Sequence, residues 1–171
     1  MLKIPYKRLT YAPYTGALPV PPKGLKLKDH QPAALRFALE RNRSYLGLDP
    51  GLGKTIIAAL TAAANKRAIV YLSPPFLIEN IKAEFETWAP KLKVCVYGAK
   101  GKRVVSPSKA NVLLVPDSII LRDSFFEDVC EFIRMFGEYD SLLIVDEAHR
   151  YKDEGAKRTQ VLFGDTKISY P

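Results

Sequence analysis

The chain has 171 residues, of which 47% are hydrophobic and 26% charged, so its composition is that of a globular domain rather than a disordered chain. It contains no apolar run near the roughly 18 residues of a membrane span, and its first residues lack the apolar core of a secretory signal, which favours an intracellular, non-membrane protein. The net charge is +8, and the acid-free segments 1–28 and 91–109 each carry six basic residues. These segments predict either contact with a polyanion or a solvated surface.

The N-terminal segment is rich in proline. Residues 1–28 hold five of the 13 prolines, a density that forbids regular helix and predicts an extended basic arm. The following residues, HQPAALRFALERN, predict a helix capped by Asp29 and ending near Asn42, with Pro32 tolerated in its first turn. We expect residues 29–171 to form one lobe.

Strands and helices then alternate along the chain. Continuous apolar runs predict strands, and apolar residues at steps of three and four predict helices. The strands are expected at 44–49, 68–73, 93–97, 111–116 and in SLLIVDEAH from Ser141, and the helices at 55–66, 76–88, 124–136 and 156–164. This order predicts an α/β fold with a mostly parallel, doubly wound sheet. Cys95 and Cys130 fall in a strand and a helix and are interpreted as core residues, since no CxxC spacing indicates zinc.

A glycine-rich segment joins the first expected strand to the next helix. It reads Pro50-Gly51-Leu52-Gly53-Lys54-Thr55. In that context backbone N–H groups and the helix dipole can hold phosphates, Lys54 can reach the β and γ phosphates, and the Thr55 hydroxyl can ligate Mg²⁺. Leu48 stands where the strict Walker A pattern has its first glycine. The alternative is a strand-to-helix turn that binds nothing.

Two acids follow the last expected strand. Four apolar residues run into Asp146 and Glu147, which places both carboxylates at the carboxyl end of the strand, where ligands of α/β proteins bind. Asp146 suits the second protein contact to Mg²⁺, and Glu147 suits positioning and deprotonating an attacking water. The alternative is a solvated strand end.

Four segments together carry a family resemblance. DPGLGKT, IVDEAHRYKD, the early Gln31 and SPPFLIENIKAEFETW resemble the first RecA-like lobe of superfamily-two helicases and translocases, most closely the Swi/Snf branch, over residues 25–165. The resemblance implies ATP and Mg²⁺ as cofactors and backbone contact with nucleic acid, DNA rather than RNA. It also implies a second RecA-like lobe in the same protein, which supplies an arginine to the γ-phosphate.

The resemblance also assigns roles to two polar residues. It implies that Gln31 reads adenine through its amide, although Lys28 and His30 depart from the family pattern. It implies that His149 couples the nucleotide site to the second lobe. The alternatives are a polar helix-start residue for Gln31 and a hydrogen-bonded structural histidine for His149.

The nucleic-acid contacts are expected on another part of the lobe. By resemblance, Pro74, Pro75 and the following helix start hold the nucleic-acid backbone, with Lys82 nearby. Val115–Ser118 occupies a further family position near the bound strand. Two glycines and three cations at 98–103 suit a phosphate contact by Lys100, Lys102 and Arg103, and a solvated loop is the alternative.

We therefore expect an ATP-binding lobe of a DNA-dependent helicase or translocase that hydrolyses ATP when joined to a second lobe. Since the sequence stops before that lobe, the 171 residues alone are expected to hydrolyse ATP weakly or not at all. A standalone nucleic-acid-binding or regulatory module and an unrelated P-loop enzyme such as a small kinase are the alternatives.

Overall fold

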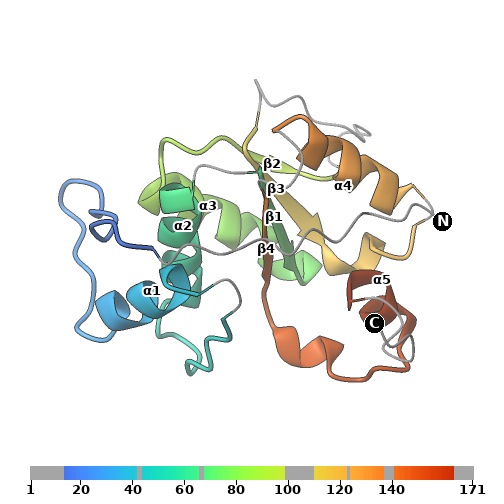
Figure 1. Cartoon of the computed structure of the whole chain (residues 1–171), viewed down its shortest axis with the longest axis horizontal. Helices are drawn as coiled ribbons and strands as arrows, with labels where there is room; N and C mark the ends of the chain where they lie inside the picture. Colours follow the sequence, from blue (N-terminus) through green and yellow to red (C-terminus); the bar gives the residue numbers. More distant parts are fainter. Residues whose placement is uncertain are drawn as a thin grey trace.

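A parallel sheet forms the centre of the computed structural model, which describes residues 14–41, 44–65, 68–98, 110–122, 124–136 and 141–163. Its four strands lie in the order β2-β3-β1-β4, and every pairing is parallel (Figure 1). The strands are β1 (Ala68–Ser73), β2 (Val94–Val96), β3 (Val112–Pro116) and β4 (Ser141–Val145). The predicted parallel α/β architecture is confirmed.

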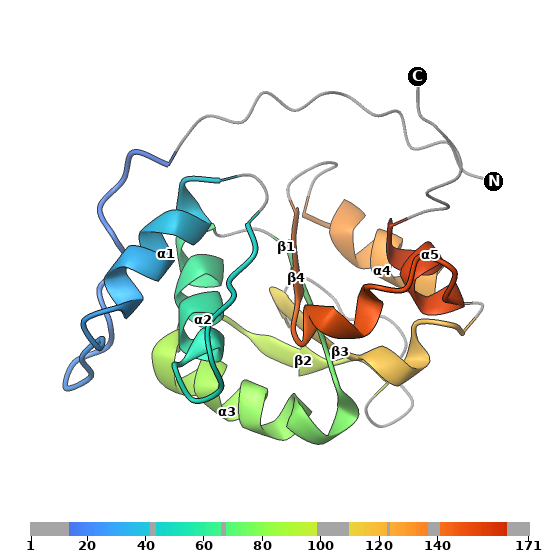
Figure 2. The ribbon, with the colours of Figure 1, turned by 90° about the horizontal axis from the view of Figure 1, so that it is seen from below.

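Helices cover both faces of this sheet. Figure 2 shows α1, α2 and α3 on one side and α4 and α5 on the other, so the sheet is doubly wound. The helices are α1 (Gln31–Leu39), α2 (Lys54–Asn65), α3 (Ile78–Trp88), α4 (Phe125–Arg134) and α5 (Lys157–Phe163). Three short 3₁₀ turns follow the carboxyl ends of strands: η1 (Pro75–Leu77), η3 (Asp117–Ile119) and η4 (Ala148–Tyr151).

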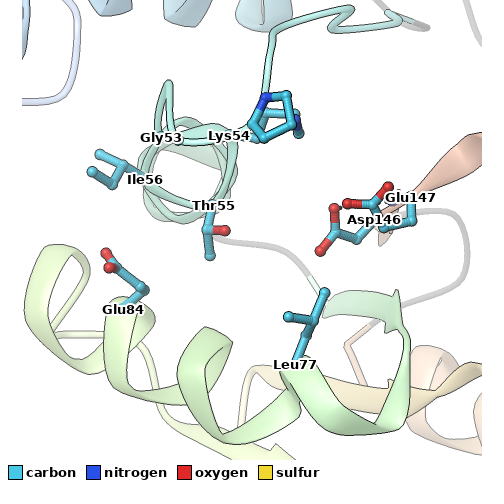
Figure 3. Close-up of a pocket in the computed structure, with 10 residues that line it drawn as sticks. Gly53, Lys54, Thr55, Ile56, Leu77, Glu84, Asp146 and Glu147 are labelled. Atoms are coloured by element: carbon cyan, nitrogen blue, oxygen red, sulfur yellow. Dashed lines mark hydrogen bonds between the residues drawn. The ribbon is translucent and has the colours of Figure 1, made fainter.

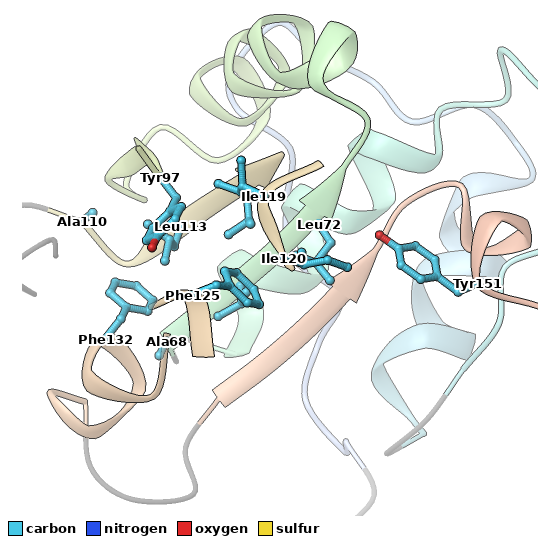
Figure 4. Close-up of a cluster of buried hydrophobic side chains, with 12 residues drawn as sticks. Ala68, Leu72, Tyr97, Ala110, Leu113, Ile119, Ile120, Phe125, Phe132 and Tyr151 are labelled. Atoms are coloured by element: carbon cyan, nitrogen blue, oxygen red, sulfur yellow. The ribbon is translucent and has the colours of Figure 1, made fainter. Parts of the chain in front are cut away.

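The central strand β1 supplies side chains to two cores. Alternate residues such as Val70 and Leu72 pack with Phe125 and Phe132 of α4 (Figure 4). The side chains on the opposite face of β1, among them Ile69, pack against α2 and α3. All six residues of β1 are buried because the strand has a neighbour on each side and helices on each face, which explains its continuous apolar run.

The strand predicted at 44–49 is wrong, because those residues contain no strand. Tyr45 is 72% exposed, while Leu46 and Leu48 pack against the core between α1 and α2. Within the described chain, β4 is an outer strand like β2, and its Leu143 is 47% exposed, so the apolar run of β4 is only partly buried. A strand needs a hydrogen-bonding neighbour, and residues 44–49 have none in the described sheet.

Element ends differ from the predictions by a few residues. His30, not Asp29, is the N-cap of α1, it makes no side-chain capping bond, and the helix ends at Leu39. Pro32 lies in the first turn, as predicted. Both cysteines are free and only partly buried. None of the helices in the described ranges is long and apolar enough to cross a membrane.

The proposed division between arm and lobe stays a prediction. Residues 14–28 contain neither helix nor strand, and residues 1–13 lie outside the described ranges. Leu18 and Leu27 pack against the core formed by α1 and α2. This described part of the expected arm therefore contacts the lobe.

Candidate functional site

A pocket of about 380 Å³ opens beside the start of α2 and the carboxyl end of β4 (Figure 3). This volume lies within the range of small-ligand sites. The pocket brings together most residues of the two sequence motifs. Its lining residues are Pro50, Gly51, Gly53, Lys54, Thr55, Ile56, Leu77, Glu84, Asp146 and Glu147.

The turn before α2 depends on two glycines. Gly51 and Gly53 have φ angles of +80° and +79°, a region that L side chains rarely adopt. A Cβ atom on Gly53 would also collide with the Gln31 amide nitrogen. Both positions therefore require glycine, which leaves the backbone of this turn open to a ligand.

Gln31 of α1 supports the same turn from behind. Its side chain is 1% exposed, its amide nitrogen donates to the Leu52 carbonyl at 3.1 Å, and its amide oxygen accepts from the Lys28 N–H at 2.9 Å. His30 Nε2 also lies 3.0 Å from the Leu52 carbonyl oxygen. Gln31 thus joins α1 to the glycine turn, and adenine recognition by its amide stays a prediction.

Lys54 and Thr55 occupy the first turn of α2, as the glycine motif predicts. The Lys54 ammonium donates to the Leu48 carbonyl oxygen at 2.8 Å, so it folds back over its own loop. A phosphate bound by this lysine would replace that carbonyl as the acceptor. Because the acceptor at Leu48 is a backbone carbonyl, a leucine at this position supplies it as well as a glycine would.

Asp146 is fixed directly after β4. Its backbone N–H donates to Leu72, its Oδ1 accepts from the Glu147 N–H at 3.0 Å, and its Oδ2 accepts from Ser73 Oγ at 3.4 Å. Burial raises the pKa of Asp146, and the hydrogen bonds from Glu147 and Ser73 oppose that rise. The structure therefore holds a partly buried carboxylate in one orientation.

Asp146 and Thr55 face each other across the pocket (Figure 3). A carboxylate and a hydroxyl are the hard oxygen donors that Mg²⁺ prefers, and Mg²⁺ usually takes only one or two such groups from the protein. The described residues contain no cluster of three or more acidic, histidine or cysteine side chains that could hold a metal. The pair thus suits a cation that shares its remaining positions with water and a phosphate ligand.

Glu147 adopts a strained backbone conformation at the edge of the pocket. Its φ of 50° and ψ of 46° lie in the left-handed region, which costs a residue with a side chain on the order of 1–3 kcal/mol. Its Oε2 lies 3.1 Å from Nδ1 of His149, whose side chain is 63% exposed. His149 therefore contacts the carboxylate at the site, and its coupling role stays a prediction.

Glu84, which no sequence motif marks, reaches the pocket from α3. Its Oε2 is buried and has no hydrogen-bond partner among the described residues. The sequence feature that could have indicated this residue is its position next to the buried Phe85, at the border of the apolar stripe in EFETW. It went unnoticed because charged residues at such borders usually lie in solvent.

The residues expected to contact nucleic acid are not part of the pocket lining. Pro74 is buried and Pro75 is exposed, and α3 itself begins only at Ile78. The N–H of Leu77 donates to Pro74 and that of Ile78 to Pro75, so these amides are already used within the turn. Lys82 forms a surface ion pair with Glu86 at 3.6 Å.

The remaining expected contacts are partly outside the described chain. Lys100, Lys102 and Arg103 lie outside the described residues. In the Val115–Ser118 segment, Ser118 is exposed, but Asp117 is only 2% exposed and pairs with arginines instead. The Asp117 side chain is therefore not part of the outer surface.

Comparison with known proteins decides the family. The model of the DEAD/DEAH box helicase family matches residues 28–164. The chain belongs to this family. It is similar to CHR23 of Arabidopsis thaliana, a probable ATP-dependent DNA helicase, with 29% identity in a match that covers 77% of this chain and 13% of the relative. It is also similar to snf22 of Schizosaccharomyces pombe, a SWI/SNF chromatin-remodeling complex subunit, with 31% identity over 81% of this chain and 9% of the relative.

A solved structure supports the fold of this helicase lobe. The SWI2/SNF2 ATPase core of Sulfolobus solfataricus, solved with double-stranded DNA, matches 81% of this chain with a TM-score of 0.65 and 20% identity. The match covers 29% of that chain. The predicted RecA-like fold is thereby confirmed. The family model and the relatives confirm the predicted Swi/Snf-type N-terminal lobe, which spans only a small part of those relatives.

Replacing Asp146 should stabilise the empty helicase lobe. Because burial raises the carboxyl pKa in the folded state, the stability linked to this group is present at low pH and lost as pH rises through the folded pKa. Asp146→Asn removes that loss, so we expect thermal unfolding to show a higher melting temperature at pH 7 and a smaller gain at pH 4. The exposed Glu79→Gln is the charge-matched control. Equal gains at both pH values would contradict the prediction.

Proposed function

We propose that this chain is the ATP-binding lobe of a DNA-dependent helicase or translocase, which hydrolyses ATP when joined to a second RecA-like lobe. One observation carries the proposal: the glycine turn at the start of α2 and the carboxylates after β4 line the same pocket in a chain of the helicase family. Glycine turns at helix starts bind phosphates, and carboxylates at strand ends bind their cation.

Each pocket residue then has a distinct task. The backbone at Gly51 and Gly53 approaches the phosphates, and Lys54 exchanges its bond to the Leu48 carbonyl for the β and γ phosphates. Thr55 and Asp146 hold Mg²⁺, which when bound neutralises charge on the phosphates. Glu147 orients and deprotonates the attacking water.

DNA is the proposed partner of the lobe. CHR23 is described as a DNA helicase, and the Sulfolobus core was solved with double-stranded DNA. We propose that the DNA backbone is contacted by Pro75, Lys82 and the cations Lys100, Lys102 and Arg103. A standalone regulatory module is not favoured, because the matched relatives include helicases and ATPases. The family match likewise disfavours a small kinase.

Loss of Lys54 tests the nucleotide site. A hydrogen bond to a charged group contributes about 1.5–3 kcal/mol, so Lys54→Ala should weaken Mg·ADP binding about 10- to 100-fold in isothermal titration calorimetry. Lys82→Ala, which removes a lysine from a surface ion pair on α3, is the control and should bind normally. Unchanged affinity in a folded Lys54→Ala variant would refute the assignment of the loop.

A further inference from the structure

Tyr71 places a hydroxyl group inside the apolar layer between the sheet and its helices. The residue lies in the centre of β1, opposite Leu114 of β3 and Ile144 of β4, and is 2% exposed. Its ring packs edge to face against Phe85 of α3, with 5.6 Å between centroids. A phenol in such a layer needs a hydrogen-bond partner, and its hydroxyl is not among the buried groups that lack one.

The partners of this hydroxyl are the two residues that face each other in the pocket. Tyr71 hydrogen-bonds with both Thr55 and Asp146. An ionised carboxylate can only accept, so the Tyr71 O–H donates to Asp146, and the Tyr71 oxygen accepts from the Thr55 hydroxyl. A directed chain of two bonds therefore runs from Thr55 through Tyr71 to Asp146.

The direction of these two hydrogen bonds affects how the site can bind a cation. A hydroxyl that ligates a metal offers a lone pair, so its hydrogen must point to another acceptor. Tyr71 provides that acceptor for Thr55, and the same phenol donates its own hydrogen to the Asp146 carboxylate. Groups that orient metal ligands in this way strengthen metal binding although they do not touch the ion.

We infer that Tyr71 is a positioning residue for the divalent cation, because it orients both protein ligands through one hydroxyl. The inference rests on the proposed nucleotide function and extends it to a residue outside both sequence motifs. In the sequence AIVYLS, Tyr71 is indistinguishable from an ordinary core residue.

Tyr71→Phe tests the inference because it removes the hydroxyl and keeps the ring against Phe85. We expect the Mg²⁺ concentration for half-maximal strengthening of ADP binding to rise about 10-fold, and the affinity for Mn²⁺ measured by electron paramagnetic resonance on the ADP complex to fall equally. ADP affinity in EDTA should stay unchanged. Tyr151→Phe, a buried tyrosine outside the pocket lining, is the control.

The possible outcomes separate the two claims. If the parent chain binds ADP without any effect of Mg²⁺, the proposed function fails. If the parent responds to Mg²⁺ and folded Tyr71→Phe responds identically, the inference about Tyr71 is overturned while the function stands. Ser73→Ala, which removes another bond to Asp146 and none to Thr55, gives a second test. If Ser73→Ala weakens cation binding as much as Tyr71→Phe does, the claim that Tyr71 orients both ligands is contradicted.

Discussion

Glu147→Gln is expected to lower ATP turnover by about 10²- to 10⁴-fold in the longest natural form of this helicase, with nucleotide affinity nearly unchanged. Glutamine keeps the shape of glutamate and its reach into the pocket, but it cannot accept a proton from water. The predicted loss therefore falls on the rate constant kcat rather than on KM. Phosphate release at saturating ATP, with duplex DNA present, measures kcat. Calorimetry with Mg·ADP measures nucleotide binding.

The backbone around Glu147 supports this assignment. Its left-handed conformation is fixed on both sides, because its N–H donates to Asp146 Oδ1 and its carbonyl accepts from the Arg150 N–H at 2.9 Å. Strain that is held in this way is frequent at active sites. Glu127→Gln removes an exposed acid on α4 and should turn over normally. Normal turnover by Glu147→Gln would remove Glu147 from the chemistry.

Sequence patterns predicted the inner part of the fold well. Strands β1 and β3 are buried on both faces, so almost every side chain in them must be apolar. Helix α4 separates its buried Phe125 and Phe132 from exposed acids, which produces a clear helical period. The Gly51–Thr55 motif was predictable because its backbone angles and its charge impose residue types locally.

The failures share a physical cause, which is dependence on distant neighbours. Residues 44–49 have strand-like composition, but a strand exists only where another strand can pair with it. Gln31 bonds to Leu52 across 21 positions, and Tyr71 contacts Thr55 and Asp146 from different elements. No local pattern marks such contacts. The left-handed angle of Glu147 is equally invisible in the letters DEAH.

An ion cluster around the buried Asp117 carries the second large prediction. Asp117 is 2% exposed and lies 3.0 Å from Arg150 of η4 and 3.9 Å from Arg158 of α5. The neighbouring Tyr151 is buried in the same region, where burial and the Asp117 charge raise its pKa to about 12. Thr159 also donates to the Tyr151 carbonyl at 3.3 Å. The cluster thus joins the end of β3 to η4 and α5.

Removal of both arginines should destabilise the fold by about 3–5 kcal/mol, because it leaves the Asp117 charge buried without a partner. We expect this loss in urea unfolding of Arg150→Met/Arg158→Met, since methionine keeps the apolar stem of arginine. The single Arg150→Met variant should lose more than Arg158→Met because its guanidinium lies closer to the carboxylate. Arg36→Met, which breaks an exposed pair with Glu40, should cost at most about 1 kcal/mol.

A third substitution distinguishes charge burial from lost packing. Adding Asp117→Asn to the double variant removes the orphaned charge but restores no arginine contact. If the penalty comes from the buried carboxylate, the triple variant should regain much of the lost stability. If the triple variant is as unstable as the double variant, guanidinium contacts other than the pairing with the Asp117 charge hold η4 and α5 to the end of β3.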